Sequence, residues 1–450
     1  MSCLIKPFSA THYNPVSITD LAPLVCPPYD VINEEELISL KKKSPYNFSR
    51  ILLANDNNYK KIGDRFKKWI QRGVFVKDKQ ENLYLYEQKF SYQGKRYARF
   101  GIISLLRLDK KGVVIPHEHT LSKPKKDRKR IIEKVKANLS PIFVITTSAL
   151  STLAQIHKSC KKTQPFFQFK DSRGDDNLVW KIGNKEDIKK IVQELNKCQL
   201  IIADGHHRFE VAYDYAKKNK KKFKDLNYIL AYITDAQKSL LLLPTHRIIK
   251  AEEKGCLEKL GKYFYITKVS QKLLEEKLKK NKGKFCFGIY PIRKIPCDKP
   301  RGRYSSTRAE FNSHEFSNGI YQNKFFFLRL KSSVVLDTII KDCTYLGRSF
   351  SLKKKDYEIY KHLDVYLLHK IVFPLLGLKG QITYTHNVKE AKSEENNNSI
   401  AFILKPPTLK TVFAIANKGY RLPQKSTYFY PKVPSGIVIR KFEKHGKTGS

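Results

Sequence analysis

The 450-residue sequence predicts an α+β fold, a mixed α/β arrangement in which short buried strands and amphipathic helices both run through most of the chain. Apolar runs of about four to eight residues, bounded by Gly, Pro or Asp, are typical of buried strands. Other stretches place their apolar residues on one face, which is typical of helices. A hydrophobic content of 41% is compatible with a packed core. At about 150 residues per domain, the length allows two or three domains.

The N-terminal half contains the clearest elements. Residues 34–43 and 59–72 have helical spacing, and Gly73 ends the second stretch. Residues 83–90 and 97–103 are strand-like and are joined across a Gly-containing turn, which indicates a hairpin. Further strands are expected at residues 112–115, 178–182, 200–203, 228–234 and 240–243, and further helices from residues 122, 185 and 271. Residues 298–318 read as a polar loop.

The strand at residues 200–203 leads into Asp204–Arg208, where one carboxylate, two imidazoles and one guanidinium lie within five residues. Gly205 permits a positive φ angle. The helix predicted to follow presents unpaired N–H groups and a partial positive charge, which suit a phosphate. Arg208 adds a planar fork of donors for the same kind of ligand. The turn therefore predicts an anion site, and the plainer alternative is a tight turn with a capping Asp and solvated imidazoles.

A second polar cluster follows the strand at residues 112–115. Glu118 stands between two imidazoles, so it could act as a base or bind a metal. Lys125 and Arg128, near the start of the next helix, could hold phosphate oxygens. The alternative is a solvated basic helix start.

Several other polar residues sit in stiff or turn-like segments. Asp30 ends a Pro-Pro-Tyr-Asp run that could place it rigidly in a site. His246 and Arg247 follow an apolar strand directly, and ligands in α/β folds collect at such strand ends. Lys425 and Ser426 resemble the end of a P-loop, but the glycines that a P-loop needs upstream are missing.

Composition limits the cell compartment and the partners. The net charge of +45 comes mostly from scattered Lys. This pattern fits an AT-biased coding sequence as well as a nucleic-acid-binding surface, so nucleic-acid binding stays a minor alternative. The eight Cys form no Cys-x-x-Cys pair, which favours a reducing cytoplasm. No signal-peptide pattern is present, and the apolar run 365–378 is broken by charged residues and a Pro, so we expect a cytoplasmic protein without membrane spans.

The chain resembles a bacterial family named domain of unknown function 1015, in motifs spread over nearly its whole length. The shared motifs are Pro27–Ile32, Ser44–Asn47, Pro116–Glu118, Asn138–Phe143, Ala203–Arg208, Pro244–Arg247 and Pro423–Phe429, together with Lys125 and Asp127–Arg128. His119 and Phe209 stand where the family is expected to carry Arg and Tyr. The turn Asp204 to Arg208 also resembles the phosphate-binding turn of the ParB/sulfiredoxin superfamily. This resemblance implies a ParB/sulfiredoxin-like nucleotide-binding core within residues 1–250 and an additional mixed α/β region at 251–450.

One branch of that superfamily phosphorylates free serine. The resemblance therefore implies a nucleotide-dependent small-molecule kinase that converts L-serine to O-phosphoserine, with ATP or ADP as donor and Mg²⁺ as the metal. Glu118 and His207 would be catalytic. Asp204, Gly205, His206, His207, Arg208, Lys125 and Arg128 would bind the nucleotide, and Asp204 would also hold the metal. The candidates for binding the small-molecule substrate are Asp30, His246, Arg247, Lys425 and Ser426.

Three alternatives remain beside the kinase. The histidines around Glu118 and at 206–207 could form a transition-metal site of a metal-dependent hydrolase. A nearby Arg and the lack of a helical His-x-x-x-His pair disfavour this. The second is a ParB-like nucleic-acid-binding protein, whose affinity would fall steeply with salt. The third is a nucleotide-binding protein without catalysis.

Overall fold

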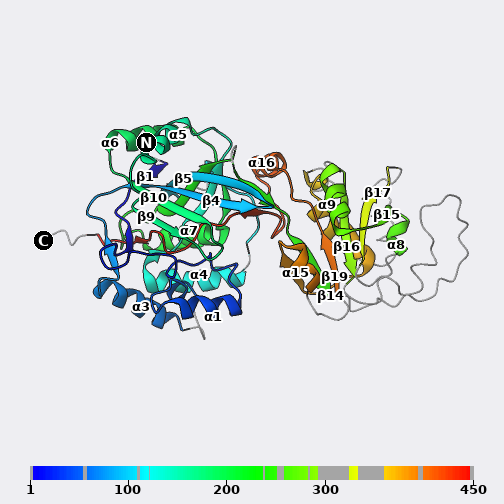
Figure 1. Ribbon diagram of the computed structural model, residues 1–450, viewed down its shortest axis with the longest axis horizontal. Coiled ribbons are helices and arrows are strands. Elements are labelled where there is room, and N and C mark those ends of the chain that lie inside the picture. Colours follow the sequence, from blue (N-terminus) through cyan, green and yellow to red (C-terminus); the bar gives the residue numbers. More distant parts are fainter. Residues whose placement is uncertain are drawn as a thin grey trace, which may run out of the picture. The chain divides into compact units, whose positions relative to one another are not determined.

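The computed structural model describes residues 4–53, 58–108, 112–120, 122–236, 239–250, 258–281, 284–291, 324–332, 359–393 and 399–445. The predicted loop at 298–318 lies outside these residues. The chain forms two compact units, Met1–Leu241 with Phe429–Ser450, and Leu242–Tyr428. Both units contain helices and strands (Figure 1), which confirms the mixed α/β fold class. The ParB/sulfiredoxin likeness of the core stays a prediction.

The first unit is built on a large mixed sheet. Nine of the described strands form it, in the order β6-β11-β8-β12-β5-β4-β10-β9, with β1 also paired to β5. Their bounds are β1 Ile5–Lys6, β4 Leu83–Tyr92, β5 Lys95–Arg107, β6 Val114–Pro116, β8 Ile142–Thr146, β9 Phe167–Lys170, β10 Asp176–Ile182, β11 Leu200–Asp204 and β12 Tyr228–Asp235. Strand β11 runs parallel to β6 and antiparallel to β8, so its end lies beside the residues that follow β6.

Helices cover this sheet. Their bounds are α1 Glu34–Lys43, α2 Ser49–Leu52, α3 Tyr59–Gln71, α4 Ser122–Val135, α5 Ser151–Cys160, α6 Lys185–Asn196 and α7 His206–Asn219. In Figure 1, α5 and α6 lie on one side of the first unit and α1, α3 and α4 on the other. Capping follows the sequence: the Asn33 side chain accepts from the Glu36 N–H at the start of α1, and Asn184 caps α6 in the same way.

The end of the chain is built into the first unit. Ser435 donates its N–H to the carbonyl of Cys26 at 2.8 Å, and Ile439 bridges to Thr11. Strand β21 (Arg440–Lys441) pairs with β7 (Ala137–Asn138). Two further short strands, β2 (Thr11–Tyr13) and β3 (Phe75–Lys77), pair with each other. These contacts fix the segment after β20 (Tyr428–Tyr430) within the first unit.

The second unit has a smaller antiparallel sheet. Its described strands follow the order β15-β17-β16-β19-β14-β18. Their bounds are β14 His246–Lys250, β15 Phe264–Val269, β16 Cys286–Pro291, β17 Phe325–Leu330, β18 Ile382–Thr385 and β19 Ser399–Ile403. The short strand β13 (Leu241–Leu243) spans the sequence boundary between the units. The helices are α8 Glu258–Gly261, α9 Gln271–Lys280, α13 Asp364–Leu367, α14 Phe373–Leu376, α15 Val388–Ser393 and α16 Leu409–Asn417.

The apolar run at 365–378 is part of this second core. It forms α13, a π-helical turn (Leu368–Val372) and α14, and nearly all of its apolar side chains are buried. Within the described ranges, no helix combines the length and the apolar character that crossing a membrane requires.

Candidate functional site

The turn between β11 and α7 has the geometry that its sequence predicts. Gly205 adopts a φ of 94° and precedes α7, which begins without a side-chain cap. A Cβ atom at this position would lie 2.8 Å from the Ile142 Cγ2 atom and 3.0 Å from the Arg208 Nη2 atom. Only glycine therefore lets the chain turn this closely against β8. The uncapped helix start leaves the partial positive charge of α7 beside the turn.

Asp204 is the centre of a buried cluster of charges at this turn. One of its oxygens accepts from Arg208 Nη2 at 2.7 Å, and the other accepts from Lys432 Nζ. Arg208 Nη1 also donates to the carbonyl of Pro141. Burial alone would raise the pKa of Asp204, but Lys432 and Arg208 outweigh it and hold the pKa well below its ordinary value. The cluster thus joins one carboxylate to two cations.

Arg208 keeps part of its donor capacity. Its Nε atom is buried, and within the described residues it has no hydrogen-bond acceptor. A buried donor without an acceptor is costly, and an anionic ligand at the start of α7 would satisfy it.

Two neutral imidazoles pack beside the cluster. His117 Nδ1 lies 2.6 Å from the carbonyl of Ile202, so this nitrogen carries the proton. The backbone N–H of His117 donates to His206 Nε2 at 3.3 Å, which leaves the His206 proton on Nδ1. Burial is the main cause that lowers the pKa of His117 to about 4, and it also lowers the pKa of His206 well below 6.5. Both rings are therefore uncharged at neutral pH.

The pKa of His117 makes stability depend on pH. The unfolded chain takes up this proton near pH 6.5, whereas the folded protein resists it until about pH 4. This contribution is therefore complete above pH 6.5 and is lost as the pH falls towards 4, by about 3 kcal/mol in total. We expect His117→Asn, whose amide can still donate to Ile202, to reduce the drop in the urea midpoint between pH 7 and pH 4.5. The exposed His445→Asn is the control, and equal drops in both variants would contradict this account.

The predicted phosphate ligands on α4 have partners within the protein. Lys125 Nζ donates to Glu210 Oε2 at 3.2 Å, and Thr120 Oγ1 donates to the same oxygen at 2.8 Å. These bonds tie the start of α4 to the second turn of α7. Arg128 donates from Nε to Asp127 at 2.8 Å and stacks on the Tyr29 ring at 3.9 Å.

The remaining predicted residues of the first unit lie close to this cluster in sequence. Glu118 directly follows His117 and is half-buried, and His207 is half-buried in the first turn of α7. Asp30 follows Tyr29, which stacks on Arg128, and is itself exposed.

The other four predicted substrate ligands belong to the second unit, where the described contacts are structural. Arg247 is almost fully buried and donates to the carbonyls of Thr245 and Lys425. The His246 Nδ1 atom accepts from the N–H of Leu404 at 3.2 Å, and burial lowers its pKa to about 3. Ser426 donates to the carbonyl of Pro423. A substrate role for these residues stays a prediction.

The donor set around Asp204 does not suit a metal ion. Both carboxylate oxygens contact cations, so a divalent ion there would meet two positive charges. Across the part of the chain that the structure describes, no group of three or more His, Cys, Asp or Glu could hold a metal. No residue is assigned to a metal on this basis, and the predicted contact of Asp204 to Mg²⁺ stays a prediction.

Comparison with known proteins places the chain in a family. The family model described as "Protein of unknown function (DUF1015)" matches residues 5–366. The chain belongs to this family, which confirms the resemblance seen in its motifs. A search of curated proteins gives no match.

Solved structures show only distant likenesses. A free serine kinase variant in complex with ADP is 14% identical, with 76% of this chain and 92% of that chain covered and a TM-score of 0.34. A C-terminally truncated SbnI from Staphylococcus aureus is 10% identical, with coverage of 75% and 87% and the same TM-score. A conserved hypothetical protein from Pyrococcus furiosus is 14% identical, with coverage of 75% and 95% and again a TM-score of 0.34.

Proposed function

We propose that this protein is a nucleotide-dependent phosphotransferase that acts on the hydroxyl of a small molecule, with free L-serine as the first acceptor to test. The observation that carries the proposal is the start of α7. There Gly205 allows close approach, the helix has no side-chain cap, and Arg208 has a buried donor without an acceptor among the described residues. Helix starts of this kind suit phosphate groups.

The residues of the first unit can be given roles on this basis. Phosphoryl transfer depends mainly on charge neutralisation and positioning. The N–H groups at the start of α7, His207 and Arg208 would face the phosphates of ATP or ADP. Glu118, which follows the neutral His117, would accept the proton of the acceptor hydroxyl. Mg²⁺ accompanies nucleoside phosphates in such reactions, and no residue of this chain is assigned to it.

L-serine is chosen because of the resemblance of the turn to the free serine kinase branch of the ParB/sulfiredoxin superfamily. Asp30 is the substrate candidate of the first unit, and its exposure is compatible with contact to a small ligand.

Glu118→Gln tests the proposed chemistry. Purified protein is incubated with L-serine, Mg²⁺ and either ATP or ADP, and O-phosphoserine is followed by phosphorus NMR. Loss of a general base should slow product formation about 10²- to 10⁴-fold. His207→Ala is assayed beside it, and the exposed Glu133→Gln on α4 serves as the control.

Each outcome separates one alternative. If nucleotide binds but wild type makes no phosphoserine, the serine kinase is wrong, and a different acceptor or a non-catalytic binding protein remains. If Glu118→Gln matches wild type, Glu118 is not the base. If no nucleotide binds, the phosphotransferase itself is wrong, and salt-dependent nucleic-acid binding becomes the next test.

A further inference from the structure

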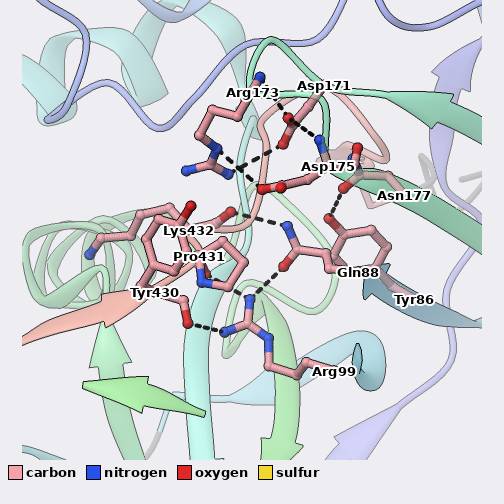
Figure 2. A network of polar contacts seen from close by, with 10 residues as sticks. All are labelled: Tyr86, Gln88, Arg99, Asp171, Arg173, Asp175, Asn177, Tyr430, Pro431 and Lys432. Atoms are coloured by element: carbon pink, nitrogen blue, oxygen red, sulfur yellow. Dashed lines mark hydrogen bonds and ion pairs between the residues drawn. The ribbon is translucent and has the colours of Figure 1, made fainter. Parts of the chain in front are cut away.

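A buried polar network holds the segment after β20 in the first unit. Arg99 on β5 donates from Nη2 to the carbonyl of Pro431 at 2.7 Å and from Nη1 to the carbonyl of Tyr430 at 3.4 Å. Gln88 on β4 donates from Nε2 to the carbonyl of Lys432 at 3.3 Å, and its Oε1 accepts from Arg99. Figure 2 shows both side chains converging on these three successive carbonyls.

Burying the Arg99 side chain to hold a backbone segment has a high free-energy cost. It is 1% exposed and packs over the rings of Phe143 and Tyr232. Among the described residues, no carboxylate forms a salt bridge with it. Burial lowers its pKa from the ordinary value. A buried cation without a direct salt bridge costs several kcal/mol. The hydrogen bonds from Arg99 to the carbonyls of Tyr430 and Pro431, together with the Asp175 carboxylate that acts on it through space, offset part of this cost.

A second group of contacts fixes the same segment from another direction. The guanidinium of Arg173 lies 5.4 Å from the centre of the Tyr430 ring, and it forms ion pairs with Asp171 and Asp175. Figure 2 shows this acidic group and the Arg99–Gln88 pair beside the same segment. Tyr430 to Lys432 are thus held through both backbone and ring.

The result is the placement of one side chain, Lys432. Its backbone carbonyl accepts a hydrogen bond from Gln88, and its side chain points away from Arg99 (Figure 2). The Nζ atom of that side chain donates to Asp204. The side chain is only 6% exposed. Lys432 and Arg208 share a single carboxylate, so the three groups carry one net positive charge beside the start of α7.

We propose that Lys432 is an anion-binding residue that contacts the phosphate oxygens of the nucleotide, and that Arg99 and Gln88 are the positioning residues that hold it in reach. The inference rests on the proposed function, since it names a further ligand of that phosphate site. Asp204 keeps Lys432 and Arg208 at the turn, so both cations lie beside the start of α7, where a phosphate group would bind.

Calorimetric titration of ADP and of inorganic pyrophosphate into the full chain tests this. Lys432→Met keeps the length and apolar stem of the side chain but removes the charge. We expect it to weaken both ligands about 10- to 100-fold, the value of a hydrogen bond to a charged group. Lys432→Arg should restore part of the affinity. Lys441→Met, an exposed lysine on β21, is the matched control and should bind as wild type does.

Gln88→Met tests the positioning role. If Gln88 acts through Lys432, this change weakens pyrophosphate in the wild-type background but adds nothing in the Lys432→Met background. A purely structural Gln88 would lower the melting temperature without this coupling, and that result would overturn its positioning role.

The outcomes also separate the inference from the proposed function. If Lys432→Met binds both ligands as tightly as wild type, the assignment of Lys432 is wrong and the nucleotide site stands. If wild type binds neither ADP nor pyrophosphate, the proposed function and the inference are both overturned.

Discussion

Asp204→Asn is expected to destabilise the first unit by about 3–5 kcal/mol, because it leaves the buried Lys432 and Arg208 without their common counter-charge. The amide can accept a hydrogen bond from one of the cations, but it carries no charge and its nitrogen repels the other. Urea unfolding followed by circular dichroism measures the effect. The exposed Asp214→Asn removes a carboxylate from α7, the helix that follows Asp204, and should change the midpoint little.

The same variant has a second expected property. With the carboxylate gone, a bound polyanion supplies the missing negative charge, so pyrophosphate should raise the unfolding midpoint of Asp204→Asn more than that of wild type. Sodium chloride at equal ionic strength is the reference for general salt effects. A midpoint for Asp204→Asn equal to that of Asp214→Asn would show that the described charge cluster does not stabilise the fold.

Gly205→Ala is the second change with a large expected effect. The positive φ angle of 94° costs a non-glycine residue about 1–2 kcal/mol. The added Cβ would also lie 2.8 Å from Ile142 and 3.0 Å from the Arg208 guanidinium, so overpacking should add about 1–3 kcal/mol. Because Arg208 must shift to relieve the contact, we expect nucleotide affinity to be lost together with stability.

Gly73→Ala separates these two causes. Gly73 also has a positive φ, 71°, but a Cβ there meets nothing within 4 Å. It should therefore show the cost of the backbone conformation alone, with no effect on ADP affinity. If Gly205→Ala loses no more stability than Gly73→Ala and binds ADP normally, the close approach of the turn to Ile142 and Arg208 has no functional role.

The local elements of the fold could be predicted because their signals are local. The helix over residues 34–43, the hairpin formed by β4 and β5, and the strand before Asp204 all follow from short-range patterns. The αL glycine at 205 is predictable in the same way, since the Asp-Gly turn and the following helix leave few other conformations.

The second cation of the site could not be predicted from such patterns. Lys432 meets Asp204 across 228 residues, and Arg99 reaches Pro431 across 332. In the sequence, Lys432 is one of many scattered lysines, and nothing local distinguishes it. Only the sheet order and the return of the chain end into the first unit bring it to β11.

The same limit explains the residues around His246. A polar turn after a buried strand predicts a ligand site as readily as it predicts buried structural contacts. In the structure, Arg247 donates to backbone carbonyls and His246 accepts from a backbone N–H. A ligand site and a set of buried structural contacts can have the same sequence pattern, because the pattern does not show which partners the fold supplies. The substrate role of His246 and Arg247 therefore stays a prediction.

A crystal structure of the protein with ADP tests the central claim most directly. We expect the phosphates to lie at the start of α7, within hydrogen-bond distance of the N–H groups there, of Arg208 Nε and of Lys432 Nζ. ADP bound elsewhere, with the Asp204 cluster unchanged, would contradict it.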